Sequence, residues 1–181
     1  MELFEKKISS EQVFDGVVVK LFVDQVELPN KKTSVREIIR HPGAVCVIPV
    51  TSEGEVIMVR QFRYAFDSVL LEIPAGKLEK GEDPLEAAKR ELEEESGAVA
   101  KNIEYLGEIY TTVAILDEKI HLYLATELEF KNAHPDEDEF LEVEKIPLTT
   151  LVDMVMRGEI RDSKTQIAIL KAHKILSERT K

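Results

Sequence analysis

The sequence lacks the features that mark several classes of protein. It has one cysteine and no tryptophan in 181 residues, and no apolar run approaches the roughly 20 residues needed to span a bilayer. A single cysteine excludes a disulfide framework, and Cys46 lies in an apolar run that predicts a small buried side chain. The N-terminal segment, residues 1–7, has no signal-peptide apolar region, so we expect a cytoplasmic protein that does not enter a membrane.

An excess of positive charge is also missing. The 24 lysines and arginines are outnumbered by 35 aspartates and glutamates, which gives a net charge of −11. Such a balance does not attract a nucleic-acid backbone or an anionic membrane, so neither is an expected partner. A small anionic substrate remains compatible with it, because a bound divalent cation and a few arginines reverse the field inside one cleft.

The chain alternates extended segments with a few helical ones. Residues 17–27 and 33–40 predict one hairpin across Pro29-Asn30, and residues 44–50 and 55–62 predict a second one. The remaining predicted strands are residues 69–73, 103–110, 119–126 and 140–146, and the predicted terminal helices are residues 148–157 and 163–177. Mixed strands with few helices favour an α/β sandwich.

Residues 84–96 have helical periodicity with punctuation at both ends. Asp83 is a suitable N-cap, Pro84 occupies the first helical position, Glu86 has capping-box spacing and Gly97 ends the helix. This is the best-defined helix that the sequence predicts.

Three glutamates share one face of this helix. Glu91, Glu94 and Glu95 stand at i, i+3 and i+4, so their carboxylates lie within one turn of each other. Like charges at this spacing destabilise a helix and call for a cation, and clustered oxygen ligands suit Mg²⁺ or Mn²⁺. A solvated acidic face is the alternative. An adjoining apolar stripe and Arg90, which is placed to position Glu94, favour the metal site.

The spacing around these glutamates extends to a 23-residue motif. Gly76, Glu82, Arg90-Glu91-Leu92, Glu94-Glu95 and Gly97-Ala98 resemble the Nudix box at each defining position, with Ala98 at the final aliphatic position. The resemblance implies a Nudix fold, an α/β/α sandwich around a mixed sheet, with an N-terminal β-strand extension. It also implies a strand-loop-helix that binds metal and promotes attack of water on phosphorus.

Further segments resemble those of bacterial ADP-ribose pyrophosphatases. They are residues 26–30, 36–37, 41–45, 60–63, 72–76, 136–139 and 162–165. The resemblance implies magnesium-dependent hydrolysis of ADP-ribose or a related nucleoside diphosphate sugar to a nucleoside monophosphate and a sugar phosphate. It also implies two parts, a strand extension at residues 1–40 that forms a homodimer and a Nudix domain at residues 41–181.

The resemblance assigns roles to individual residues. The Ala75 carbonyl with Glu91, Glu94 and Glu95 would hold metal ions, and Glu94 and Arg90 would belong to the catalytic group. Arg63, Glu72, Glu118 and Arg36 would bind substrate, with Glu118 near a ribose and Arg36 reaching in from the partner subunit. Arginine suits this task because its planar fork matches phosphate oxygens. The base that activates water would be Glu137 or, second, Glu139, because the loop length leaves the alignment open by a residue or two.

Two features leave the function open in detail. Where ADP-ribose enzymes carry Ser-Pro-Gly, this chain has Thr112-Val113-Ala114, which predicts a differently shaped substrate loop. A non-catalytic Nudix-like nucleotide-binding module is the alternative function, although binding alone does not require three clustered glutamates. Hydrolysis of an RNA pyrophosphate is disfavoured by the acidic net charge. His41, His121 and Arg60 are expected to serve packing, hydrogen bonding or an ordinary ion pair.

Overall fold

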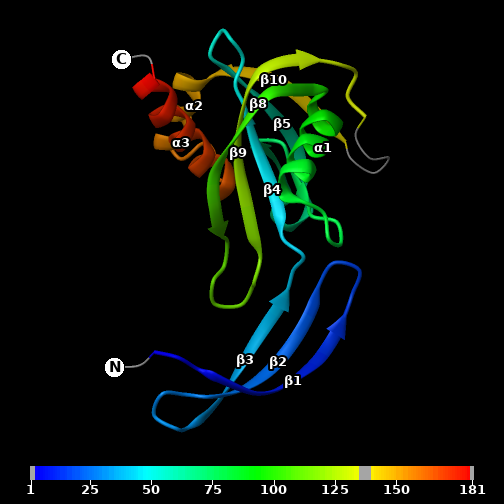
Figure 1. Cartoon of the computed structure of the whole chain (residues 1–181), viewed down its shortest axis with the longest axis vertical. Coiled ribbons are helices and arrows are strands. Elements are labelled where there is room, and N and C mark those ends of the chain that lie inside the picture. Colours follow the sequence, from blue (N-terminus) through cyan, green and yellow to red (C-terminus); the bar gives the residue numbers. More distant parts are fainter. Residues whose placement is uncertain (1–2, 135–139, 180–181) are drawn as a thin grey trace. The chain divides into compact units, whose positions relative to one another are not determined.

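The structure, a computed structural model, describes residues 3–134 and 140–179. Contacts divide the chain into two compact units. One unit comprises residues 1–43 and 110–119, and the other comprises residues 44–109 and 120–181. Figure 1 follows the chain through both units. Residues 110–119 therefore belong with the N-terminal strands, although they lie far along the sequence.

The smaller unit is built on a three-stranded antiparallel sheet. Strands β1 (Lys6–Asp15), β2 (Lys20–Glu27) and β3 (Thr33–Arg40) pair in sequence order. This arrangement confirms the hairpin predicted from residues 17–40. The sequence did not predict β1, because all ten of its residues are exposed and no apolar face alternates along it.

A loop from later in the chain joins this unit at β3. The Ile39 amide donates to the Ile115 carbonyl at 2.7 Å, and the Asp117 amide donates to the Ile39 carbonyl at 3.2 Å. Ile39 and Leu116 form an isolated parallel bridge. These backbone bonds fix residues 115–117 against the edge of the N-terminal sheet.

The larger unit contains two sheets. One has the order β10-β5-β6, and the other has the order β7-β4-β9-β8, in which β4 and β9 are parallel. The second sheet is therefore mixed, as the resemblance implied. The strands are β4 (Ala44–Pro49), β5 (Glu55–Arg63), β6 (Ser68–Glu72), β7 (Ala75–Lys77), β8 (Ala98–Tyr110), β9 (Lys119–Phe130) and β10 (Leu141–Pro147), with a 3-10 turn η1 (Tyr64–Phe66) between β5 and β6.

The second predicted hairpin is wrong in its pairing. Strands form at 44–49 and 55–63, but they lie in different sheets, and the turn between them is marked by an isolated bridge between Val50 and Val56 and by a hydrogen bond from the Thr51 amide to the Glu55 carbonyl. The two edges of β4 are occupied by β7 and β9, and those of β5 by β10 and β6. A tight turn in the sequence signals a reversal of the chain, and it does not specify which strands then pair.

Helix α1 (Pro84–Ser96) has the predicted bounds and caps. The Asp83 carboxylate accepts from the amides of Leu85 at 2.9 Å and Glu86 at 3.2 Å, which satisfies two donors that the first turn leaves unpaired. Gly97 ends the helix at φ 69°, in the left-handed region, and its amide donates to the Glu93 carbonyl.

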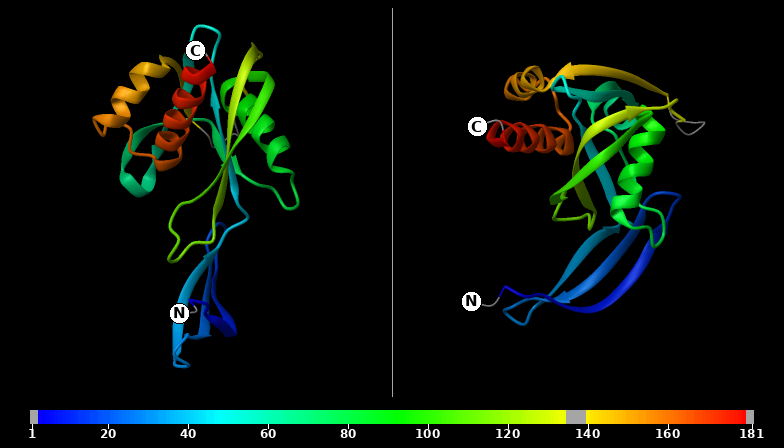
Figure 2. Two further views of the ribbon diagram at one scale, coloured as in Figure 1. Left: turned by 60° about the vertical axis from the view of Figure 1, so that its left-hand side comes forward. Right: turned by 45° about the horizontal axis from the view of Figure 1, so that its top comes forward.

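Strand β4 is buried on both faces, which makes it the centre of a sandwich. Val45 and Val47 pack with Ala88 and Leu92 of α1. Cys46 and the other alternate residues of β4 pack toward α2 (Leu148–Met156) and α3 (Ser163–Arg179). Figures 1 and 2 show α1 on one side of this sheet and α2 with α3 on the other. The α/β/α sandwich is thus confirmed.

Cys46 is fully buried in this core, and burial raises the pKa of its thiol to about 12. Within residues 3–134 and 140–179, no helix is both long and apolar enough to cross a membrane.

Candidate active site

Residues 74–76, which follow β6 and lead into β7, are held by contacts at successive positions. The Pro74 carbonyl accepts from the Val47 amide at 2.9 Å, and the Ala75 amide donates to Glu95 Oε2 at 3.0 Å. Pairing between β7 and β4 then sets Gly76 opposite Val45. The backbone of Ala75 and Gly76 is therefore fixed beside the glutamate face of α1.

Gly76 lets the Glu91 carboxylate lie directly against the backbone. A Cβ atom at this position would stand 1.9 Å from Glu91 Oε1 and 2.3 Å from Oε2, closer than real Cβ contacts allow. Glycine is thus needed here for space. Glu91 is only 9% exposed, so its charge is held close to the turn.

Arg90 links the acidic side chains of the motif. Its guanidinium donates to both carboxylate oxygens of Glu82, at 3.0 and 3.2 Å, and through Nη1 to Glu91 at 2.8 Å and Glu94 at 2.9 Å. The hydrogen bonds with Glu82 and the charges around it raise the pKa of Arg90 above its ordinary value. The predicted contact between Arg90 and Glu94 is present, and Arg90 orients three carboxylates of the motif.

Arg90 faces three carboxylates of this cluster, those of Glu82, Glu91 and Glu94, so one positive charge lies among three negative ones. Among the residues that the structure describes, no three carboxylate, imidazole or thiol groups already converge on one point. The reason is visible in the contacts: Arg90 holds Glu91 and Glu94, whereas Glu95 accepts from the Ala75 amide. Oxygen donors in charge excess, beside a turn kept open by glycine, fit a hard divalent cation.

Arg63 lies at the end of β5 on a buried carboxylate. Its Nε and Nη2 donate to the two oxygens of Glu72 at 2.7 and 2.8 Å, and Lys164 Nζ donates to Glu72 Oε2 at 2.5 Å. The Arg63 side chain is 40% exposed, whereas that of Glu72 is 3% exposed. Burial alone would raise the pKa of Glu72, but the hydrogen bond from Arg63 and the charge of Lys164 lower it to about 2. The buried Glu72 carboxylate therefore orients the Arg63 guanidinium, while part of the Arg63 side chain remains accessible to solvent.

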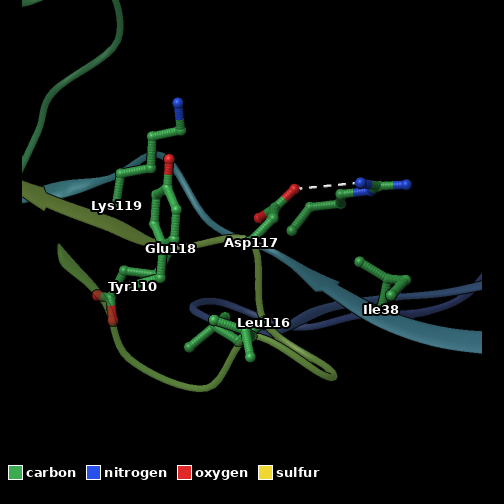
Figure 3. A pocket seen from close by; sticks show the side chains of 8 residues that line it. Ile38, Tyr110, Leu116, Asp117, Glu118 and Lys119 are labelled. Carbon is green, nitrogen blue, oxygen red and sulfur yellow. Dashed lines mark hydrogen bonds and ion pairs between the residues drawn. The ribbon is translucent and has the colours of Figure 1, made fainter. Parts of the chain in front are cut away.

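Two expected substrate residues lie in the smaller unit. Arg36 on β3 pairs with Glu5, with Arg36 Nε donating to Glu5 Oε2 at 3.0 Å. Glu118 accepts from the Thr111 hydroxyl at 2.9 Å and lies 3.4 Å from His41 Nδ1. Within this unit Glu118 lines a pocket of about 310 Å³ whose wall also includes Ile38, Leu116 and Lys119, as Figure 3 shows.

That pocket has a fixed polar side. Asp117 Oδ2 accepts from Arg40 Nη1 at 3.1 Å, the interaction drawn in Figure 3, and Asp117 Oδ1 accepts from the His41 amide at 2.8 Å. Arg40 also donates to Asp24 at 2.9 Å. Val113, from the segment that departs from the Ser-Pro-Gly pattern, is one of the lining residues.

The remaining candidate residues lie outside helix α1 of the motif. Glu137 and Glu139 lie outside the described residues. Arg60 pairs with Glu144 at 2.6 Å, which confirms the ordinary ion pair predicted for it. His121 lies 3.4 Å from the Tyr105 hydroxyl, as expected for a hydrogen-bonding residue. Lys164 was not among the expected site residues, and its signal in the sequence is its place in residues 162–165, a segment that resembles ADP-ribose pyrophosphatases.

Comparisons with known proteins agree with this geometry. The NUDIX domain family matches residues 40–166. The chain is 49% identical over 169 residues to the ADP-ribose pyrophosphatase of Bacillus subtilis (strain 168), which covers 92% of this chain and 91% of that protein. It is 50% identical over 171 residues to the methanol dehydrogenase activator of Bacillus methanolicus, covering 93% and 92%. A crystal structure of an ADP compounds hydrolase superposes with a TM-score of 0.89 at 22% identity, over 99% of this chain and 98% of that one.

Proposed function

Because the chain belongs to the NUDIX domain family, we propose that it hydrolyses the pyrophosphate bond of ADP-ribose or a related nucleoside diphosphate sugar. The products are a nucleoside monophosphate and a sugar phosphate. The observation that carries the proposal is the close approach of the Glu91 carboxylate to Gly76, beside Glu94 and Glu95 on one face of α1. A module that only bound a nucleotide would not need this concentration of negative charge.

Nudix hydrolases generally use divalent metal ions. In this chain the ion, Mg²⁺ or Mn²⁺, would be held by the Ala75 carbonyl and by Glu91, Glu94 and Glu95. When bound, it supplies neutralisation of the pyrophosphate charge and lowers the pKa of a bound water. The Ala75 amide and Arg90 orient these ligands through the hydrogen bonds that they already make.

The remaining residues bind and orient the substrate. Glu72 fixes the plane of the Arg63 guanidinium, and Arg63 contacts the pyrophosphate of the substrate. Because the side chain is already ordered, little conformational entropy is lost when the substrate binds. We assign Glu137, with Glu139 second, as the base that accepts a proton from the attacking water. We assign further substrate contacts to Glu118 and to Arg36, with Arg36 reaching in from the partner subunit of a homodimer.

The proposal also divides the chain into two functional parts. Residues 1–40 form a strand extension that makes a homodimer, and residues 41–181 form the catalytic domain. The exposed apolar side chains of the extension support this role, and they include Ile8, Val13, Phe14 and Val35. Burial of such a patch between two subunits is an ordinary fate for exposed apolar surface.

A product assay tests the activity. Purified protein is incubated with ADP-ribose and Mg²⁺, and the products are identified by mass; AMP and ribose 5-phosphate are expected, with no turnover in excess chelator. Glu94→Gln should abolish most turnover. Glu93→Gln is the matched control, because Glu93 lies on the same helix and pairs with Lys131 at 2.8 Å instead of with the cluster.

Two outcomes of that assay would contradict the proposal. Tight binding of ADP-ribose without products would identify a nucleotide-binding module. Equal turnover in the Glu94→Gln variant and the control would remove the three-glutamate site.

A second candidate function comes from the Bacillus methanolicus relative. Identity of 50% over 93% of this chain favours activation of a methanol-oxidising dehydrogenase as well. Dehydrogenase turnover would be measured with the wild-type chain and with Glu94→Gln. Activation by the wild type alone would tie the effect to hydrolysis, and activation by neither protein would exclude it for that dehydrogenase.

A further inference from the structure

Four buried or half-buried charges meet where β6 ends and α3 begins. Lys164 bridges Glu72 at 2.5 Å and Asp162 at 3.0 Å, and Arg63 occupies the other side of Glu72. The Lys164 side chain is 12% exposed. Its burial lowers the pKa of the amine, but Asp162 and Glu72 outweigh burial and raise that pKa above its ordinary value. Two cations thus balance two anions; Lys164, Glu72 and Asp162 are largely buried, whereas Arg63 is exposed on one side.

A backbone contact runs beside this charge cluster. The Ile73 amide donates to Thr165 Oγ1 at 3.1 Å, and that hydroxyl donates in turn to Asp162 Oδ2 at 2.6 Å. Thr165 is fully buried. Residues 73–75 are therefore bonded one after another, by Thr165, by Val47 and by Glu95.

We propose that Lys164 and Thr165, at the start of α3, are positioning residues for the hydrolytic reaction. This inference rests on the function proposed above. Lys164 neutralises Glu72 and Asp162 and holds Glu72 in the position that orients Arg63, and Thr165 helps to fix the backbone that carries the Ala75 carbonyl. Neither residue needs to touch the substrate for this role.

The electrostatic part follows from the charge balance. With Lys164 present, Glu72 and Asp162 are neutralised by two cations, Lys164 and Arg63. Arg63 uses Nε and Nη2 for Glu72, and 40% of its side chain is exposed. Without the lysine charge, one guanidinium faces two carboxylates, and the local field turns negative where a pyrophosphate must bind. The loss should appear in substrate binding more than in the chemical step.

Lys164→Met tests this part. We expect KM for ADP-ribose to rise roughly tenfold, the equivalent of about 1.4 kcal/mol, with a much smaller change in kcat. Lys164→Arg should restore most of the binding because it keeps the charge. Lys174→Met is the matched control, since Lys174 lies on the same helix with a 72% exposed side chain. Its KM should equal that of the wild type.

Removing one partner of a buried ion pair also destabilises a fold, so a second variant is needed. The double variant Lys164→Met with Glu72→Gln removes one charge of each sign. If Lys164 acts through Glu72, the double variant should bind ADP-ribose better than Lys164→Met alone. Equal KM in the two would show that Lys164 acts by another route and would overturn the proposal.

Thr165→Val tests the backbone part. The substitution keeps the shape of the side chain and leaves the Ile73 amide without its acceptor. We expect a roughly tenfold fall in kcat and a rise in the Mg²⁺ concentration for half-maximal rate, because one of the three successive bonds that position the Ala75 carbonyl is lost. Thr165→Ser, which keeps the hydroxyl, should recover both. Unchanged metal dependence in Thr165→Val would refute this part.

These results are distinguishable from failure of the proposed function. If the wild type does not hydrolyse ADP-ribose while Glu94→Gln behaves like it, the function is wrong. If the wild type is active and Glu94→Gln is not, but Lys164→Met keeps a wild-type KM, the function stands and the positioning role falls.

Discussion

Gly76→Ala should separate activity from stability in this protein. The new methyl group would lie 1.9 Å from Glu91 Oε1, and the nearest tolerable contact is 3.0 Å, so the carboxylate must move by about 1 Å. A displacement of about 1 Å at a reacting centre costs on the order of a hundredfold in rate. We therefore expect kcat/KM for ADP-ribose to fall about a hundredfold and the Mg²⁺ requirement to rise.

The same substitution should not weaken the fold. Gly76 is not among the glycines of positive φ, so alanine fits its backbone, and the crowded atoms belong to the end of a flexible side chain. Gly→Ala at a compatible position stabilises by about 0.4–1 kcal/mol through the unfolded chain. Thermal unfolding followed by circular dichroism should give a midpoint equal to or slightly above that of the wild type.

Gly54→Ala provides the opposite case. Gly54 has φ +79° with no atom within 4 Å of a built Cβ, so alanine there is strained without touching the active site. We expect a lower unfolding midpoint and full activity below it. The reasoning is refuted if Gly76→Ala retains wild-type kcat/KM at limiting Mg²⁺, or if its activity falls only in step with its unfolded fraction.

Three more outcomes are expected. The pKa of Glu72 is lowered from 4.5 to about 2, which stabilises the fold by about 3 kcal/mol above pH 4.5. This stabilisation is lost as the pH falls from 4.5 toward 2. The difference in unfolding free energy between wild type and Glu72→Gln, measured by denaturant titration, should therefore shrink over that pH range. Sedimentation should give a dimer at micromolar concentration, and an active monomer would remove the role of Arg36 in a partner's site. Preference for ADP-ribose over GDP-mannose should stay below about a thousandfold and increase in the Val113→Pro, Ala114→Gly variant, whereas a larger natural preference would contradict the loop argument.

Local signals in the sequence were sufficient for α1. Asp83, Pro84 and Gly97 act within a turn of the helix ends, and the structure begins and ends the helix where they predict. The glutamate face and the contact of Arg90 with Glu94 follow from the same periodicity, because residues four apart meet on any helix. These features need no knowledge of the rest of the chain.

Pairings between distant segments could not be predicted in this way. Strands β4 and β5 are adjacent in sequence and belong to different sheets, because each is paired by strands from elsewhere in the chain. Lys164 meets Glu72 across 92 positions, and no local pattern marks that contact. The exposed strand β1 carries no alternating apolar residues by which it could be recognised. Resemblance to a family supplied candidates at some of these places without the contacts that give them a role.

The complete burial of Cys46 makes it a built-in reporter of opening of the fold. Only the thiolate reacts with alkylating reagents, and both the raised pKa and the surrounding core suppress it in the folded state. Because no other cysteine is present, each labelled molecule has opened the β4 core at least once. The labelling rate would thus report how often this central strand is exposed, with and without substrate or metal.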